Sequence, residues 1–202
     1  MKKLDPIIID AVSTSDEFDS THPNRAVAAC WMSHLKVAQE FLKTDEAFAL
    51  IFEDDAELYE DGFSLINGLR DQDLINIDCL QIGFNIFRGR ITGRRWVATN
   101  RFFAKFSQFK KLLIGDKRDP NSTNTLLGQL FISRSFETGT HCYLISRKLA
   151  RLMLSYNVPV IVPADVALGE LALVTNLNFY RATTSLCNQS VSPSSIDFSE
   201  AG

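Results

Sequence analysis

Residues 48–55 read Phe-Ala-Leu-Ile-Phe-Glu-Asp-Asp and decide the fold of this chain, because five apolar residues lead directly into three carboxylates. A short apolar run rich in Phe and Ile predicts a buried β-strand. In an open α/β sheet, ligands bind at the carboxyl ends of the strands. Alternate side chains of an extended chain point the same way, so we expect Glu53 and Asp55 to face one site together.

The three adjacent carboxylates predict a metal site. They repel one another, and burying them unpaired costs free energy. A divalent cation offsets that cost, and Mg²⁺ or Mn²⁺ usually binds through one or two carboxylates plus a substrate phosphate. We therefore expect Asp55 and Glu53 to be metal ligands. The alternative is that the three acids form a solvated strand end followed by a helix start. If the triplet were the only evidence, this alternative would be favoured over a metal site.

Composition predicts one globular domain. The 202 residues are 46% hydrophobic and 22% charged, and we expect a single domain over 1–190 with a polar tail over 191–202. The net charge of −3 argues against nucleic acid as a partner. No apolar run approaches the ~20 residues that cross a bilayer, and no signal peptide begins the chain, so we expect a cytoplasmic protein. The four cysteines lack metal-ligand spacing and are expected to be reduced core residues.

Apolar periodicity predicts strands alternating with helices, which indicates an α/β layered fold. Asp61 and Ser146 are predicted to cap helices. The expected strands lie at 6–12, 48–52, 78–83, 126–132, 139–145 and 177–180, and the main expected helices lie at 25–43, at 147–156 and from 164 onward.

Residues 84–113 differ from the rest, with eight Lys or Arg and no Asp or Glu. From 100 to 113, aromatic residues repeat at helical spacing between basic ones. This pattern is typical of a basic amphipathic helix that contacts an anionic membrane. The alternative, which we favour slightly, is a helix with an aromatic core face and solvated charges.

Four motifs resemble glycosyltransferase family 25, which includes lipooligosaccharide and collagen galactosyltransferases. Residues 29–34, Ala-Cys-Trp-Met-Ser-His, look like the family's helix that ends in Ser-His, and residues 48–56 look like its apolar strand with Glu-Asp-Asp. Residues 138–147 look like its Gly-x-x-x-Tyr-Leu-Ile-Ser strand and cap. Asp165 and Gln189-Ser190 fall where the family has a late Asp and a late Gln-Ser.

The resemblance implies a GT-A-like nucleotide-sugar-binding sheet flanked by helices. It also implies an inverting transfer of a sugar, often galactose, from a UDP-sugar to a glycan or lipid-linked acceptor. Mn²⁺ (or Mg²⁺) would bind at Asp55 and Glu53, and the donor would contact Glu53, Asp54, His34 and Gln189. His34 alone would be read as a core residue, and the motif makes it a donor-site residue or a metal ligand.

Inversion needs a general base on the acceptor hydroxyl, opposite the leaving group. Asp165, at a predicted helix start, is the candidate base. A role as a simple N-cap of that helix is an equally favoured interpretation of the same residue. Family members usually begin with a further strand and helix, so we expect this sheet to lack them and strand 6–12 to lie exposed at its edge. The competing functions are a degenerate glycan- or partner-binding relative, and a hydrolase that uses two carboxylates.

Overall fold

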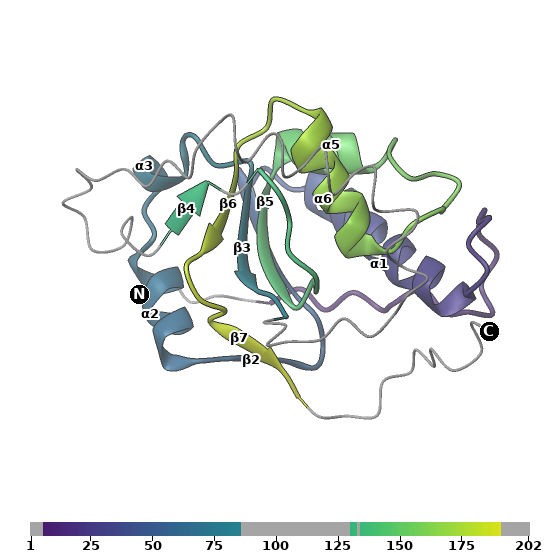
Figure 1. Cartoon of the computed structure of the whole chain (residues 1–202), viewed down its shortest axis with the longest axis horizontal. Helices are drawn as coiled ribbons and strands as arrows, with labels where there is room; N and C mark the ends of the chain where they lie inside the picture. Colours follow the sequence, from purple (N-terminus) through teal and green to yellow (C-terminus); the bar gives the residue numbers. More distant parts are fainter. Residues whose placement is uncertain (1–5, 86–129, 133, 191–202) are drawn as a thin grey trace, which may run out of the picture.

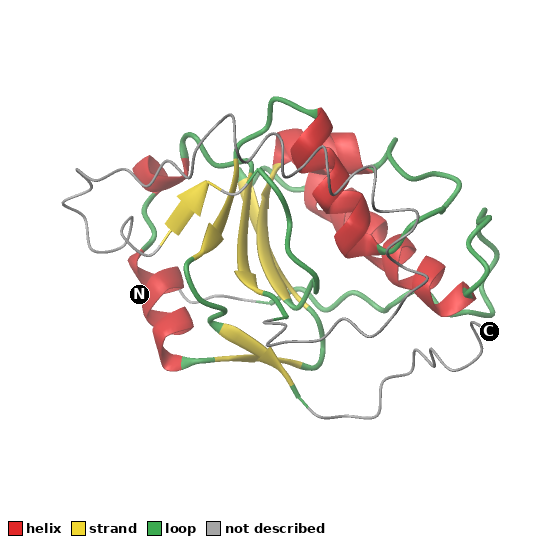
Figure 2. Cartoon of the chain, viewed as in Figure 1, coloured by secondary structure: helices red, strands yellow, loops and turns green. Residues whose placement is uncertain are grey.

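The computed structural model describes residues 6–85, 130–132 and 134–190, which form an α/β structure built on a mixed sheet (Figures 1 and 2). Its five strands lie in the order β1-β5-β3-β6-β4, and β2 pairs with β7 in a separate ribbon. The strands are β1 (Phe48–Phe52), β2 (Ala56–Leu58), β3 (Cys79–Gly83), β4 (Leu130–Ile132), β5 (Cys142–Ser146), β6 (Phe179–Ala182) and β7 (Cys187–Gln189). The helices are α1 (Arg25–Lys43), α2 (Glu60–Gly68), α3 (Asp71–Leu74), α5 (Arg147–Met153) and α6 (Ala164–Val174).

Strand directions place several chain ends at one edge of the sheet. β5 lies antiparallel between β1 and β3, and β6 runs parallel to β3. The carboxyl ends of β1, β3 and β6 therefore share an edge, and β5 begins there. The first residue of β5, Cys142, pairs with both Phe52 and Gly83, the last residues of β1 and β3. Whatever follows β1 and β3 or precedes β5 is thus brought together.

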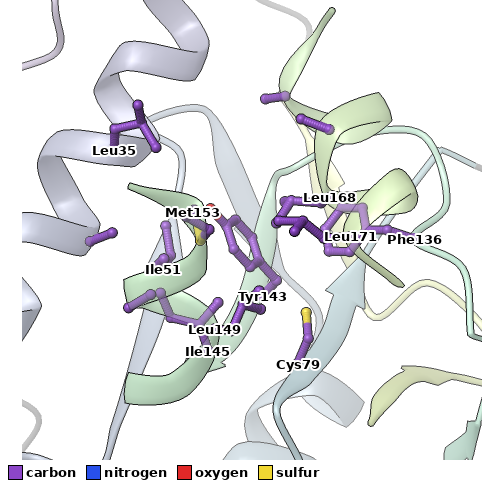
Figure 3. Packing of buried hydrophobic residues seen from close by; sticks show 14 of the residues in the cluster. Leu35, Ile51, Cys79, Phe136, Tyr143, Ile145, Leu149, Met153, Leu168 and Leu171 are labelled. Carbon is purple, nitrogen blue, oxygen red and sulfur yellow. The ribbon is translucent and has the colours of Figure 1, made fainter. Parts of the chain in front are cut away.

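Both faces of the sheet are covered. Every residue of β5 is buried, because its side chains alternate between two cores. Tyr143 and Ile145 pack under α1, α5 and α6, whereas Cys142 and Leu144 pack with residues of α2 and α3. Figure 3 shows the Tyr143 ring among apolar side chains of α5 and α6. This burial on both faces explains why β5 reads as a continuous apolar run.

Helix α1 begins and ends as its sequence predicts. The Asn24 side chain accepts hydrogen bonds from the backbone N–H of Ala26 and Val27, which caps the first turn. The apolar stripe that includes Trp31 and Leu35 is buried against the sheet, and the predicted bounds 25–43 are confirmed. The predicted strand 48–52 and the Ser146 cap of α5 are also confirmed.

The expected strand at 6–12 is wrong. This segment forms no strand, and its apolar residues Ile7 and Ile8 are 74% and 89% exposed. It is tied to α1 instead: the Val12 N–H donates to Ser33 Oγ at 2.8 Å, and Lys36 Nζ donates to the carbonyl of Asp10 at 2.8 Å. The segment therefore lies along a helix rather than at the edge of the sheet.

Other differences are local. Asp61 does not cap α2, whose N-cap is Tyr59, and Asp61 lies in the first turn. Helix α5 ends at Met153, the strand expected at 139–145 begins only at Cys142, and the last predicted strand is shifted to β6. The β2–β7 ribbon was not predicted, because both strands are too short to show a period in sequence.

The basic stretch beyond Asn85 and the tail 191–202 fall outside the described residues. So does most of the strand expected at 126–132, of which 130–132 form β4. In the part of the chain that the structure describes, no helix combines the length and apolar character needed to cross a membrane.

Gly83 lies where β7 comes close to β3, and an added side chain there should destabilise the fold, whereas one at Gly169 should not. A Cβ on Gly83 would lie 2.7 Å from Cys187 Cβ and 3.3 Å from the backbone N of Cys142. Gly83→Ala should therefore lower the free energy of unfolding by about 1–3 kcal/mol, as overpacking does. Gly169→Ala in α6, where the nearest atom would be 3.5 Å away, is the matched control and should raise it by about 0.5–1 kcal/mol. Urea unfolding measures both, and equal effects would contradict the packing at Gly83.

Candidate active site

Glu53 is the centre of a polar cluster at the shared edge of the sheet. It follows β1 directly, and its N–H donates to the carbonyl of His141 at 3.0 Å. Its Oε1 accepts a hydrogen bond from Thr140 Oγ1, and its Oε2 lies 3.3 Å from His141 Nδ1. Nε2 of His34 lies 3.5 Å from Oε1. Three elements, α1, β1 and the segment before β5, therefore meet on one carboxylate.

Hydrogen bonds keep this carboxylate charged. Burial raises the pKa of Glu53, but the hydrogen bonds from His141, His34 and Thr140 outweigh it and hold the pKa well below its usual range. Burial lowers the pKa of His34, but hydrogen bonds with Cys30 and Glu53 raise it to about 9. Burial also lowers the pKa of His141, and the bond to Glu53 with the charge of Asp55 gives a net rise. The cluster thus pairs an ionised carboxylate with two imidazoles whose pKa values are both raised by it.

His34 contacts Glu53 from α1, so the histidine of the Ser-His motif lies beside the acidic triplet as a donor-site or metal-binding role would require. His34 is 5% exposed, and its Nδ1 shares a 2.8 Å hydrogen bond with the Tyr143 hydroxyl. One helical turn earlier, Cys30 brings a half-buried thiol to the same face. The thiol, the imidazole and the carboxylate offer ligand atoms that all lie within 4.8 Å of one another. Cys30 was expected to be a core cysteine without metal-ligand spacing, and although it packs against the core, its i, i+4 spacing to His34 places its thiol beside Glu53 as well.

His141 and Asn85 complete the cluster on the side of β3. His141 Nε2 lies 3.2 Å from Asn85 Oδ1, so its two nitrogens face oxygen atoms from different strand ends. Gly139 has φ of 95° and lies against this ring, where a Cβ would come within 2.8 Å of Nε2. Thr140, His141 and Asn85 were missed from sequence, because the first two were assigned to the strand itself.

Asp165 is brought to the same neighbourhood by the loop before β5. Its Oδ2 accepts from the Gly139 N–H at 3.1 Å, and its Oδ1 accepts from the Val166 N–H at 2.8 Å. It is not the N-cap of α6, since Pro163 holds that position and Asp165 lies in the first turn. The structure thus joins Asp165, through Gly139, to the segment that carries Thr140 and His141.

Asp55 and Glu53 are held by different partners. The chain is not extended between them, because Ala56 N–H donates to the Glu53 carbonyl at 3.1 Å and closes a turn at 54–55. Asp55 Oδ2 accepts from Gln189 Nε2 at 2.6 Å, while Asp54 is exposed. Asp55 Oδ1 is buried and has no hydrogen-bond partner among the described residues. A buried carboxylate oxygen without a partner fits a cation, so Asp55 suits the expected Mn²⁺ or Mg²⁺ better than the already engaged Glu53 does.

The structure is an α/β domain with polar and acidic residues gathered where its strands end, which is where ligands bind in open α/β sheets. Residues 25–168 match the family model described as glycosyltransferase family 25 (LPS biosynthesis protein). The chain belongs to this family, which confirms the resemblance inferred from the four motifs. No curated protein matches the chain. The matched range begins at α1 and ends inside α6, so it contains Cys30, His34, Glu53 and Asp165 but not Gln189.

The bond from Thr140 to Glu53 should contribute measurably to stability. Thr140→Val keeps the shape of the side chain and removes the donor to a charged acceptor, which should lower the free energy of unfolding by about 1.5–3 kcal/mol. Thr175→Val is the comparison at a neutral acceptor: that hydroxyl donates to the carbonyl of Leu171 and accepts a longer bond, 3.3 Å, from the Leu177 N–H, and loss of the donated bond should cost about 0.5–1.5 kcal/mol. Chemical unfolding measures both variants. If Thr140→Val is no less stable than Thr175→Val, the hydrogen bond from Thr140 to a charged Glu53 is contradicted.

Proposed function

We propose that this protein transfers a sugar, galactose in the first instance, from a UDP-sugar to a hydroxyl of a glycan or lipid-linked acceptor, with inversion at the anomeric carbon. The observation that carries the proposal is the meeting of Glu53, His141 and Asp165 at the edge where β1, β3 and β6 end, in a chain of glycosyltransferase family 25. The mixed sheet with helices over it supports a GT-A-like arrangement. The donor would lie along this edge, near Asp54, His34 and Gln189.

Asp165 is the proposed general base. It would take the proton of the acceptor hydroxyl, whose oxygen then attacks the anomeric carbon from the face opposite the diphosphate. The bond from that carbon to the diphosphate breaks, and UDP leaves with the electron pair. The backbone N–H groups of Gly139 and Val166 donate to the Asp165 carboxylate and hold it in one orientation. A general base needs such a fixed orientation, because it must meet the hydroxyl of a bound acceptor.

The negative charge on the leaving UDP needs stabilisation. Asp55 would hold a divalent cation, Mn²⁺ or Mg²⁺, with Glu53 as the second carboxylate, and that cation would neutralise the developing charge. Gln189 would fix the Asp55 carboxylate, since its Nε2 donates to Oδ2 and leaves Oδ1 turned away from it. We further propose that the reaction takes place in the cytoplasm beside a membrane; the family description, which names lipopolysaccharide biosynthesis, supports the membrane part of this proposal. Residues 100–113, the proposed membrane contact, lie outside the described residues.

Asp165→Asn should reduce turnover far more than donor binding. The amide keeps oxygen as an acceptor for a backbone N–H but cannot take a proton, so the rate of UDP release should fall about 10²–10⁴-fold. The assay combines a screen of nucleotide sugars by thermal shift with UDP release in the presence of Mn²⁺ and acceptor glycans. Near-normal turnover in the folded variant would remove Asp165 as the base.

Asp55→Asn should remove the Mn²⁺-dependent part of UDP-sugar binding while the fold is kept. Glu57→Gln is the matched control, because Glu57 is an exposed acid two residues further along in β2. Isothermal titration with UDP-galactose, with and without Mn²⁺, measures the effect. If Asp55→Asn binds donor and Mn²⁺ as the unmodified protein does, the cation assignment is wrong. Binding without any UDP release would instead favour the degenerate, non-catalytic alternative.

A further inference from the structure

Cys30, His34 and Glu53 bring three different kinds of metal ligand together. Their thiol, imidazole and carboxylate atoms lie within 4.8 Å of one another at the junction of α1 with the end of β1. Thiolate and imidazole are ligands that Zn²⁺ prefers, whereas Mg²⁺ and Mn²⁺ prefer oxygen. Asp55, the residue that suits an oxygen-preferring cation, is not a member of this group. The two sites share Glu53 and differ in their other donors, which are a thiol and an imidazole here and the Asp55 carboxylate at the proposed donor cation.

The spacing of the ligands fits a tetrahedral ion. Cys30 and His34 are four residues apart on α1, so their side chains lie on one face of the helix. His34 Nε2 and Glu53 Oε1 are 3.5 Å apart. Two such ligands on a tetrahedral ion, each with a bond of about 2.0–2.1 Å, lie roughly 3.3 Å apart. Cys30 Sγ lies within 4.8 Å of the other two ligand atoms, so a small adjustment of this half-buried side chain would bring it to the distance of a Zn–S bond.

The groups around the ligands have the arrangement expected of a second coordination layer. A metal-binding histidine usually donates its other ring N–H to a fixed oxygen, and His34 Nδ1 lies 2.8 Å from the Tyr143 hydroxyl. Tyr143 is fully buried, so its oxygen holds the His34 ring with Nε2 toward Glu53. The Glu53 carboxylate is oriented by Thr140 and His141. His141 engages Oε2, whereas Thr140 donates to Oε1 itself, so Oε1 would use its remaining lone pair for the ion.

We propose that Cys30 Sγ, His34 Nε2 and Glu53 Oε1 bind a thiophilic divalent cation of the Zn²⁺ class. Binding releases the thiol proton and any proton on Nε2 to solvent, while Nδ1–H donates to Tyr143. Three protein ligands leave the fourth tetrahedral position to a water molecule. The ion would use Oε1 of Glu53, so the donor cation would be held by Asp55 and, from Glu53, only by the other oxygen, Oε2. This site needs neither donor nor acceptor, and its test is independent of the proposed transfer.

Cobalt substitution tests the site directly. Protein stripped of metal under reducing conditions is titrated with Co²⁺, whose visible spectrum reports tetrahedral geometry and whose near-ultraviolet band reports a bound thiolate. We expect one equivalent to bind with both signals, Zn²⁺ to displace it, and a large excess of Mn²⁺ not to. Cys30→Ser should abolish the thiolate band and weaken binding by at least about 100-fold, the upper range for loss of an outer partner. His34→Gln should weaken binding equally.

Controls make a negative result decisive. Cys79→Ala removes a thiol that is buried elsewhere in the core, and it should keep the thiolate band and the affinity. Circular dichroism in the absence of metal establishes that each variant is folded, and His34→Gln serves if Cys30→Ser does not fold. The proposal is overturned if the unmodified protein shows no thiolate band with stoichiometric Co²⁺. It is equally overturned if folded Cys30→Ser keeps that band, or if folded Cys79→Ala loses it.

Discussion

The partly buried carboxylate of Glu53 is the constraint on which the site depends. Only 23% of this side chain is exposed, and a charge in that position costs free energy unless other groups neutralise and hydrogen-bond it. Its partners come from α1 and from the segment before β5, and its backbone N–H donates to the carbonyl of His141. Removing one partner of such a group leaves a buried charge uncompensated, which costs more than the intact arrangement contributes. The three elements are therefore held in one relative position by the same atoms that form the site.

The core and the site share residues, so packing determines where the polar groups lie. The Tyr143 ring lies in the main core, edge-on to Phe136 with 5.5 Å between the ring centroids, and its hydroxyl shares a hydrogen bond with His34. The register of β5 then determines the rest, because Cys142 pairs with the last residues of both β1 and β3. His141 must accordingly lie between Glu53 and Asn85. An antiparallel strand between two parallel ones thus supplies polar groups at the edge where ligands bind in a parallel sheet.

Sequence reasoning worked where the signal is local and failed where it is tertiary. The 25–43 helix and the 48–52 strand were predicted because periodicity, caps and an apolar run all agree. His34, Glu53 and Asp165 were singled out from motifs, and the structure places all three near the loop before β5. Strand 6–12 was wrong because β-propensity says nothing about whether a neighbouring strand exists. Cys30, Asn85 and the adjacent pair Thr140 and His141 come from three separate segments, and only the register of β5 and the packing of α1 bring them together.

The acidic triplet consequently divides into parts with different environments. Glu53 faces a thiol, two imidazoles and a hydroxyl inside the fold, whereas Asp54 is exposed and Asp55 turns toward β7. The turn at 54–55 causes this division, since it reverses the chain between the five-stranded sheet and the β2–β7 ribbon. Gln189 lies beyond the range that matches the family, so the environment of Asp55 depends on a strand outside that range. A motif that looks like one metal site in sequence therefore presents two sets of donors, and their chemistry differs: soft ligands around Glu53, and an unsatisfied oxygen on Asp55.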